Sequence, residues 1–117
     1  MSDEPELKEK TIVVDGITPN GVNAFVSEKL GIALVVKPVL TSEDFDRFVG
    51  DVVFNDSVPF TVNRARLLYN AIGANIIVHI TDKCTRETAK KLDAAKVQWY
   101  GEKLSQVYYQ YAIVDPN

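Results

Sequence analysis

Short β-branched runs alternate with segments of helical spacing along this 117-residue chain. The apolar runs at 11–14, 32–36 and 75–81 predict buried strands, because short apolar runs bounded by turn residues are typical of strands. The run at 75–81 is so uniformly apolar that we expect it in the centre of the sheet. An aromatic and β-branched run at 107–114 predicts a last strand.

Two helices are predicted in the first half of the chain. The first is expected over 22–30, where Asn20 can cap it and apolar residues recur at helical spacing. The second is expected over 43–49, with its cap at Thr41 or Ser42 and carboxylates near its positive end. The residues between this helix and position 57 form either a very short edge strand or a loop.

Two further helices are predicted in the second half. One spans 60–72, and the other begins at Asp82 or Thr85 and continues irregularly to Leu104 with an interruption at Gly101. The helix at 60–72 is expected to bury one face, made of Val62, Ala65, Leu68 and Ile72. Its outer positions are Asn63, Arg64 and Arg66.

The order of these elements predicts the fold class. Strands that alternate with helices favour a single compact α/β domain with a mixed β-sheet packed against helices. We expect that domain to span residues 11–117. Residues 1–10 are acidic, contain a proline and show no periodicity, which predicts a disordered N-terminal tail.

Composition excludes several classes of protein. The net charge of −3 and the pI of about 5.1 argue against general DNA or RNA binding. One histidine and one cysteine, Cys84, cannot form a zinc cluster or an intrachain disulfide. No apolar stretch reaches the roughly 20 residues that cross a bilayer, and the acidic start differs from a signal peptide. We therefore expect a cytoplasmic protein without a cofactor or a membrane partner.

The beginning of the helix at 60–72 is the strongest candidate for a ligand site. Backbone N–H groups point outward from a helix start, and Thr61, Arg64 and Arg66 add donors that suit an anion. Ser57 lies just upstream. The alternative is that Ser57 or Thr61 only caps the helix and that the arginines form its solvated face.

A second group of chemical residues follows the strand at 75–81. Lys83, Arg86 and Glu87 come after the strand's carboxyl end, where α/β folds often bind ligands, although all three also fit an ordinary charged helix start. His79 lies within the strand, where a lone histidine is more often a structural residue than a catalytic base. Cys84 fits a small core residue better than a nucleophile.

The segment from Ser57 to Asn75 carries a pattern of spaced residues, which are Ser57, Ala65, Leu67, Leu68, Gly73 and, directly after the segment, Ile76. This pattern resembles that of a family of small dimeric α/β proteins of crenarchaeal viruses, which has relatives in phages and bacilli. That family includes viral ring nucleases, anti-CRISPR proteins that degrade cyclic tetra-adenylate. The resemblance extends to the helix at 40–45, to the strand at 76–80 with Lys83 and Glu87 behind it, and to the closing run at 108–114.

The chain departs from the family pattern at its catalytic residue. The family's glycine–histidine pair falls on Phe60 and Thr61, so the histidine that serves ring nucleases as a general acid is absent. The family's Asn–Ala pair after the first strand aligns with Asp15 and Gly16 by position, or with Asn23–Ala24 by residue type. Thr61 cannot donate a proton as an imidazolium can. We therefore expect ligand binding to be retained and efficient catalysis to be lost.

The resemblance and the residues together give three hypotheses. The first is a homodimer that binds a nucleotide-like anion, such as a cyclic oligoadenylate, without efficient cleavage. The second is a slow phosphodiesterase that uses Glu87 or His79 in place of the missing histidine. The third is a structural or interaction protein that has kept the fold and lost the site. In the first, the ligand-binding residues are Ser57, Thr61, Arg64, Arg66 and Lys83.

Overall fold

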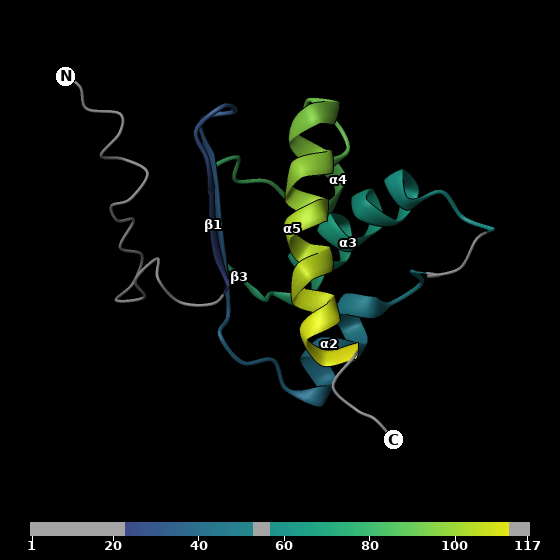
Figure 1. Ribbon diagram of the computed structural model, residues 1–117. Helices are drawn as coiled ribbons and strands as arrows, with labels where there is room; N and C mark the ends of the chain where they lie inside the picture. Colours follow the sequence, from purple (N-terminus) through teal and green to yellow (C-terminus); the bar gives the residue numbers. More distant parts are fainter. Residues whose placement is uncertain (1–22, 53–56, 113–117) are drawn as a thin grey trace.

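A β-hairpin opens the part of the chain that the computed structural model describes, which is residues 23–52 and 57–112 (Figure 1). Strand β1, Ala24–Ser27, pairs antiparallel with β2, Ile32–Val36. Gly31 closes the turn between them with a φ of 68°, a conformation that glycine adopts without a Cβ clash. The predicted helix at 22–30 is therefore wrong in the described residues.

The hairpin forms because its apolar residues also fit a strand. Phe25 lies opposite Leu34 and packs against the core, whereas the neighbouring Val26 belongs to the other face of the sheet. Two adjacent apolar residues such as Phe25 and Val26 fit both a helical pattern and a strand. The cross-strand hydrogen bonds with β2 decide between the two, since tertiary pairing overrides weak local preference.

Strand β3, Ile77–Ile80, pairs antiparallel with the other side of β2, so the sheet order is β1-β2-β3. All five residues of β2 are buried, which makes β2 the central strand. The prediction that the run at 75–81 is central is wrong for the described sheet, where β3 pairs with β2 alone. Both described strand pairs are antiparallel, in place of the mixed sheet that the element order predicted.

Helix α2, Ser42–Val49, confirms its prediction in detail. Thr41 is the N-cap, and its hydroxyl accepts a hydrogen bond from the N–H of Asp44 at 3.0 Å. The Asp44 carboxylate accepts one from the N–H of Thr41 in return, which completes a capping box. This backbone hydrogen bond is the main reason why the pKa of Asp44 lies below its ordinary value.

Helix α3, Phe60–Ala74, is also confirmed and ends at Asn75 in the left-handed conformation. Its inner face differs from the predicted one. Leu68 is fully buried as expected, but Val62 is 37% exposed and Asn63 is buried. The buried residues of α3 are Asn63, Leu67, Leu68, Asn70, Ala71 and Ala74.

The chain then forms two helices where one irregular helix and a strand were predicted. The short helix α4, Arg86–Ala89, starts at the Thr85 cap, and α5 runs from Ala94 to Ala112 without a break at Gly101. The predicted strand at 107–114 is therefore wrong over its described residues.

Aromatic packing explains the helical end of the chain. Phe45 of α2 stacks on Tyr108 with ring centroids 5.8 Å apart and contacts Tyr111 at 5.3 Å. The N–H of Leu40 donates to the Tyr111 hydroxyl at 2.9 Å. A helix brings residues 108 and 111 to one side, whereas a strand would point them to opposite faces.

The helices cover one face of the sheet, as Figure 1 shows for α5 and α3 beside the strands. The core lies between these layers and joins Leu34 and Val36 of β2 to Leu67 and Leu68 of α3 and to Tyr100 of α5. This arrangement confirms a single α/β domain with helices packed on a sheet. None of the described helices is long and apolar enough to cross a membrane.

Several predictions fall outside the described residues. These are the tail at 1–10, the strand at 11–14 with the Asp15–Gly16 pair, and most of the segment between α2 and position 57.

Candidate functional site

The start of α3, residues 57–64, lacks the usual features that close a helix N-terminus. Pro59 occupies the N-cap position, makes no side-chain capping hydrogen bond and is followed by no acidic residue in the first turn. The N-cap position belongs to Pro59, so neither Ser57 nor Thr61 occupies it. The N-terminal backbone dipole of α3 is therefore left without a carboxylate of its own helix.

An aromatic ring and a guanidinium lie together at this helix start. The Arg64 guanidinium carbon lies over the Phe60 ring, 4.5 Å from its centroid. Phe60 is 62% exposed, so much of its side chain is accessible to a ligand. In the described part of the chain, no carboxylate forms an ion pair with Arg64. A positive charge and a flat apolar surface are thus presented side by side.

Helix α5 holds this first turn in place. Gln98 of α5 donates from its side-chain amide to the carbonyl oxygen of Thr61 at 2.9 Å. The Thr61 side chain itself is exposed. This hydrogen bond therefore ties the backbone of the first turn of α3 to α5.

The structure separates the predicted ligand-binding residues into groups. Ser57, Thr61 and Arg64 share the start of α3. Arg66 lies two residues after Arg64, which places it about 200° further around the helix. Lys83 lies near Ile72, at the opposite end of a helix about 22 Å long. One small ligand can therefore contact the first group but not all five residues.

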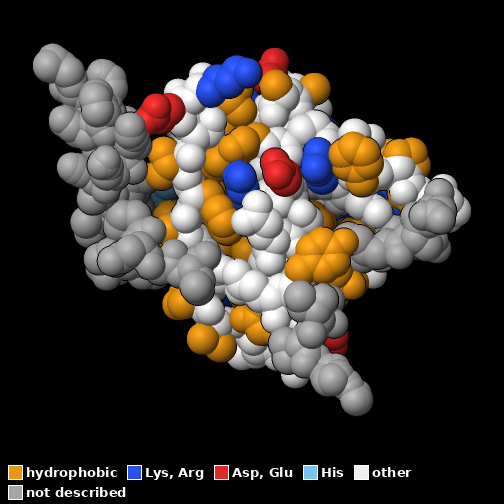
Figure 2. Space-filling model, in the orientation of Figure 1, with side chains coloured by type: hydrophobic (Ala, Val, Ile, Leu, Met, Phe, Trp, Pro, Cys, Tyr) orange, Lys and Arg blue, Asp and Glu red, His pale blue; other side chains and the backbone are white. Residues whose placement is uncertain are grey.

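Charge is distributed unevenly along the chain. Residues 57–112 contain eight lysines and arginines but only four carboxylates, although the whole chain carries −3. On the face shown in Figure 2, lysine and arginine side chains lie beside hydrophobic ones over the helices. The second half of the chain is therefore locally basic, which suits an anionic ligand despite the acidic pI.

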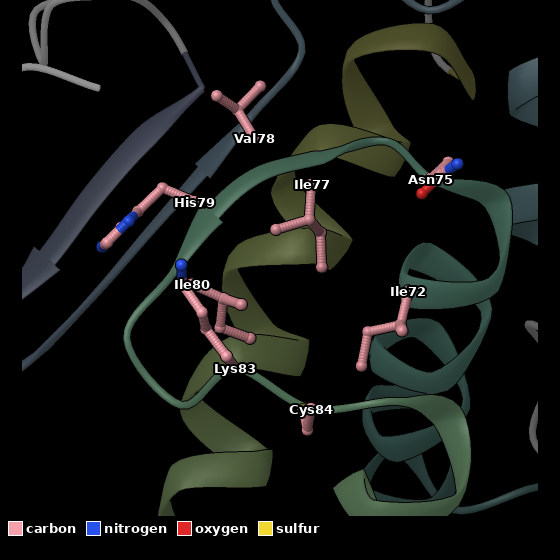
Figure 3. Close-up of a pocket in the computed structure, with 8 residues that line it drawn as sticks. All are labelled: Ile72, Asn75, Ile77, Val78, His79, Ile80, Lys83 and Cys84. Carbon is pink, nitrogen blue, oxygen red and sulfur yellow. The ribbon is translucent and has the colours of Figure 1, made fainter. Parts of the chain in front are cut away.

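His79 and Glu87, the two catalytic candidates, are not brought together. His79 lies on β3 and Glu87 lies on the short helix α4, and the described residues contain no hydrogen bond or ion pair that joins them. In Figure 3 the imidazole ring points away from Ile72 and Cys84. The geometry therefore provides no acid–base pair at either residue.

A hollow of about 260 Å³ lies beside β3 (Figure 3), and we refer to it as the β3 hollow. It is lined by Ile72, Asn75, Ile77, Val78, His79, Ile80, Lys83 and Cys84. Burial raises the pKa of the Cys84 thiol, and the neighbouring Asp82 carboxylate raises it further. The thiol is thus kept protonated and unreactive, which agrees with its predicted role as a small core residue.

The loop before α4 is fixed by a network that the sequence did not reveal. The buried Tyr100 hydroxyl donates to the Asp82 carboxylate at 2.6 Å, and Lys96 contacts the other carboxylate oxygen at 3.5 Å. Burial together with this hydrogen bond raises the pKa of Tyr100 far above its ordinary value. Asp82 is therefore a structural acceptor. Within the described ranges, no cluster of His, Cys, Asp or Glu could hold a metal ion.

Sequence reasoning also missed Phe60, the exposed aromatic residue of the helix start. The available signal was its spacing, since residues four apart in a helix are neighbours and Phe60 precedes Arg64 by four. Comparison of the chain with known protein families, with curated proteins and with solved structures finds no match.

Proposed function

We propose that the start of α3 binds a nucleotide-like anion and that the protein is a binding module with little or no catalytic activity. The observation that carries this proposal is the pairing of an exposed Phe60 ring with Arg64 at a helix N-terminus that has neither a cap nor a carboxylate. The ligand of this chemistry has both a flat ring and a phosphate.

Each part of such a ligand has a partner at this site. A base stacks on the exposed ring of Phe60, an interaction worth about 1–3 kcal/mol per base in single-stranded nucleic acid complexes. A phosphate near the first turn accepts hydrogen bonds from the N–H groups of Phe60 and Thr61, from the Thr61 hydroxyl and from Arg64. The next two N–H groups, of Val62 and Asn63, already donate to the Pro59 carbonyl. The Arg64 guanidinium neutralises the phosphate charge. No ion pair between Arg64 and a described carboxylate has to break first.

Binding and not cleavage is the function that these residues support. Phosphodiester cleavage needs a group that protonates the departing oxygen, and Thr61 cannot do this. His79 and Glu87 lie on other elements, and in the described part of the chain neither forms a hydrogen bond or ion pair with the first turn of α3. The resemblance to ring nucleases suggests cyclic tetra-adenylate as the first ligand to test.

We expect Phe60→Leu and Arg64→Gln each to weaken binding of cyclic tetra-adenylate by about tenfold or more, as measured by calorimetry. Leucine removes the stacking surface but keeps an apolar side chain, and glutamine removes the charge but keeps hydrogen-bond donors. Arg64→Gln should also reduce the salt dependence of the affinity, because it removes a charged contact.

Arg66→Gln is the matched control, since it removes the same charge from the same helix about 200° away. It should change the affinity by less than about twofold. Equal losses for Arg64→Gln and Arg66→Gln would show that only net charge matters. The proposal fails if the wild type binds neither cyclic tetra-adenylate nor linear tetra-adenylate. Product analysis in the same samples tests the slow phosphodiesterase, which requires turnover in the wild type.

We also expect the protein to form a symmetric homodimer, as in the family that it resembles. Two copies related by a two-fold axis would present two α3 starts to one cyclic ligand. Light scattering at micromolar concentration should give twice the chain mass of 13.0 kDa. A monomeric mass would contradict the proposed dimer. Calorimetry would still test the nucleotide site of the single chain.

A further inference from the structure

The β3 hollow runs along the edge of a strand. Four consecutive residues, Ile77 to Ile80, line it, although successive side chains of a strand point to opposite faces. A hollow can touch all four only if it follows the strand's edge. In Figure 3 it is bounded by Ile72 and Asn75 at the end of α3 and by Lys83 and Cys84 in the loop after β3.

This edge of β3 offers backbone hydrogen-bonding groups. The N–H of Thr81 donates to the Ala33 carbonyl at 3.2 Å, so residue 81 is directed toward β2. Backbone groups of successive strand residues alternate in direction, which turns the N–H and C=O of Ile80 toward the hollow. In the described sheet, no second strand pairs with this edge.

We infer that the β3 hollow is a docking groove for an extended acidic-apolar peptide of a partner protein, which adds to the sheet as a strand beside β3. Its backbone pairs with the free groups at Ile80, and one apolar side chain enters the space between Ile72, Ile77 and Cys84. Strand addition of this kind takes affinity from backbone hydrogen bonds and specificity from side-chain pockets.

The size of the hollow favours a peptide over a compact small molecule. Pockets for drug-sized ligands hold about 300–1,000 Å³ and are mostly enclosed. The β3 hollow holds about 260 Å³ along an open strand edge. One side chain with its backbone fits this space.

Charge sets the composition and the direction of the peptide. Lys83 is the only Lys, Arg, Asp or Glu among the eight lining residues, it is exposed, and no described carboxylate forms an ion pair with it. A carboxylate therefore belongs at the Lys83 end. The other end lies at Asn75, the C-cap of α3, whose last turn contains no basic residue. A carboxylate there would be repelled by the helix dipole.

A phage-displayed library of random dodecapeptides, selected on the full chain, tests this inference. The selected peptides should contain an acidic residue within a few positions of a branched apolar one. On binding of a selected peptide, amide exchange at Ile80 should slow by about tenfold or more. The amide of Thr81 is the internal control, because it already donates to Ala33 and should change little.

Two variants separate the groove from the rest of the surface. Lys83→Glu should weaken the selected peptides by about tenfold, whereas Lys91→Glu, the same change at an exposed turn after α4, should leave binding unchanged. Cys84→Leu should also weaken binding, because the larger side chain fills the hollow. Lys83 is exposed, so its replacement tests the groove even if Cys84→Leu folds poorly.

Three results would overturn the inference. They are a library that yields no binder, binders that leave exchange at Ile80 unchanged, and binders that tolerate Lys83→Glu as well as Lys91→Glu. Slower exchange at Ile80 with rising protein concentration, without any peptide, would assign the groove to a second copy of this chain instead of a partner.

Discussion

We expect Leu68→Ala to lower the free energy of unfolding by about 2–5 kcal/mol, the range for large-to-small changes in well-packed cores. Leu68 has no exposed surface and belongs to the cluster that joins α3, α5 and the sheet. Alanine leaves a cavity there, because residues from three elements surround the site and cannot all move inward. Urea unfolding followed by circular dichroism measures the loss.

Val62→Ala is the control for this change, because it shortens an apolar residue of the same helix where 37% of the residue is exposed. It should alter the stability by less than about 0.5 kcal/mol, as exposed substitutions usually do. The predicted inner face contained both residues, and the structure places only Leu68 in the core. If both variants lost similar stability, both residues would have to lie in the core, as the sequence predicted, and the structure would be contradicted.

The sequence correctly predicted the elements that carry strong local signals, such as a capping box or an apolar run. The capping box at Thr41 and Asp44 defined α2, and the uniformly apolar run at 32–36 defined β2. These features act within a few residues, so they can be read without knowledge of the fold. The beginning of α3 was likewise predicted within one residue of Phe60.

Elements that depend on distant partners were mispredicted. The residues of β1 have helical spacing, and only pairing with β2 makes them a strand. The run from residue 107 has strand composition, yet it is helical because α2 offers Phe45 to Tyr108 and Tyr111. In both cases a tertiary contact reversed a local preference that is weak by itself.

The sequence suggests a candidate site at the start of α3 but does not show which of the proposed residues lie together. A helix start rich in donors is visible in the sequence, and the structure adds that it is uncapped. Whether Arg64 and Lys83 meet depends on how α3 and the loop after β3 are arranged, which the sequence does not show. The exposed ring of Phe60 was missed because an apolar residue at a helix start is ordinarily assigned to the core.

Gly101→Ala should destabilise the protein by about 1–3 kcal/mol or more, although the same change usually stabilises a helix interior by up to about 1 kcal/mol. The reason is the crossing of α3 and α5. A Cβ at position 101 would clash with the backbone carbonyl of Arg64, which cannot move without a shift of α3. The glycine that the sequence marks as an interruption of α5 thus permits its close packing.

Gly73→Ala provides the matched comparison within α3. A Cβ there would lie 2.9 Å from Cδ of Arg86, an exposed and flexible side chain that can turn aside. We therefore expect Gly73→Ala to be neutral or to stabilise by up to about 1 kcal/mol, through helix propensity alone. In thermal unfolding, the midpoint of Gly101→Ala should lie below the wild-type value. The midpoint of Gly73→Ala should lie at or above it. A stabilising Gly101→Ala would show that α3 and α5 do not approach each other this closely.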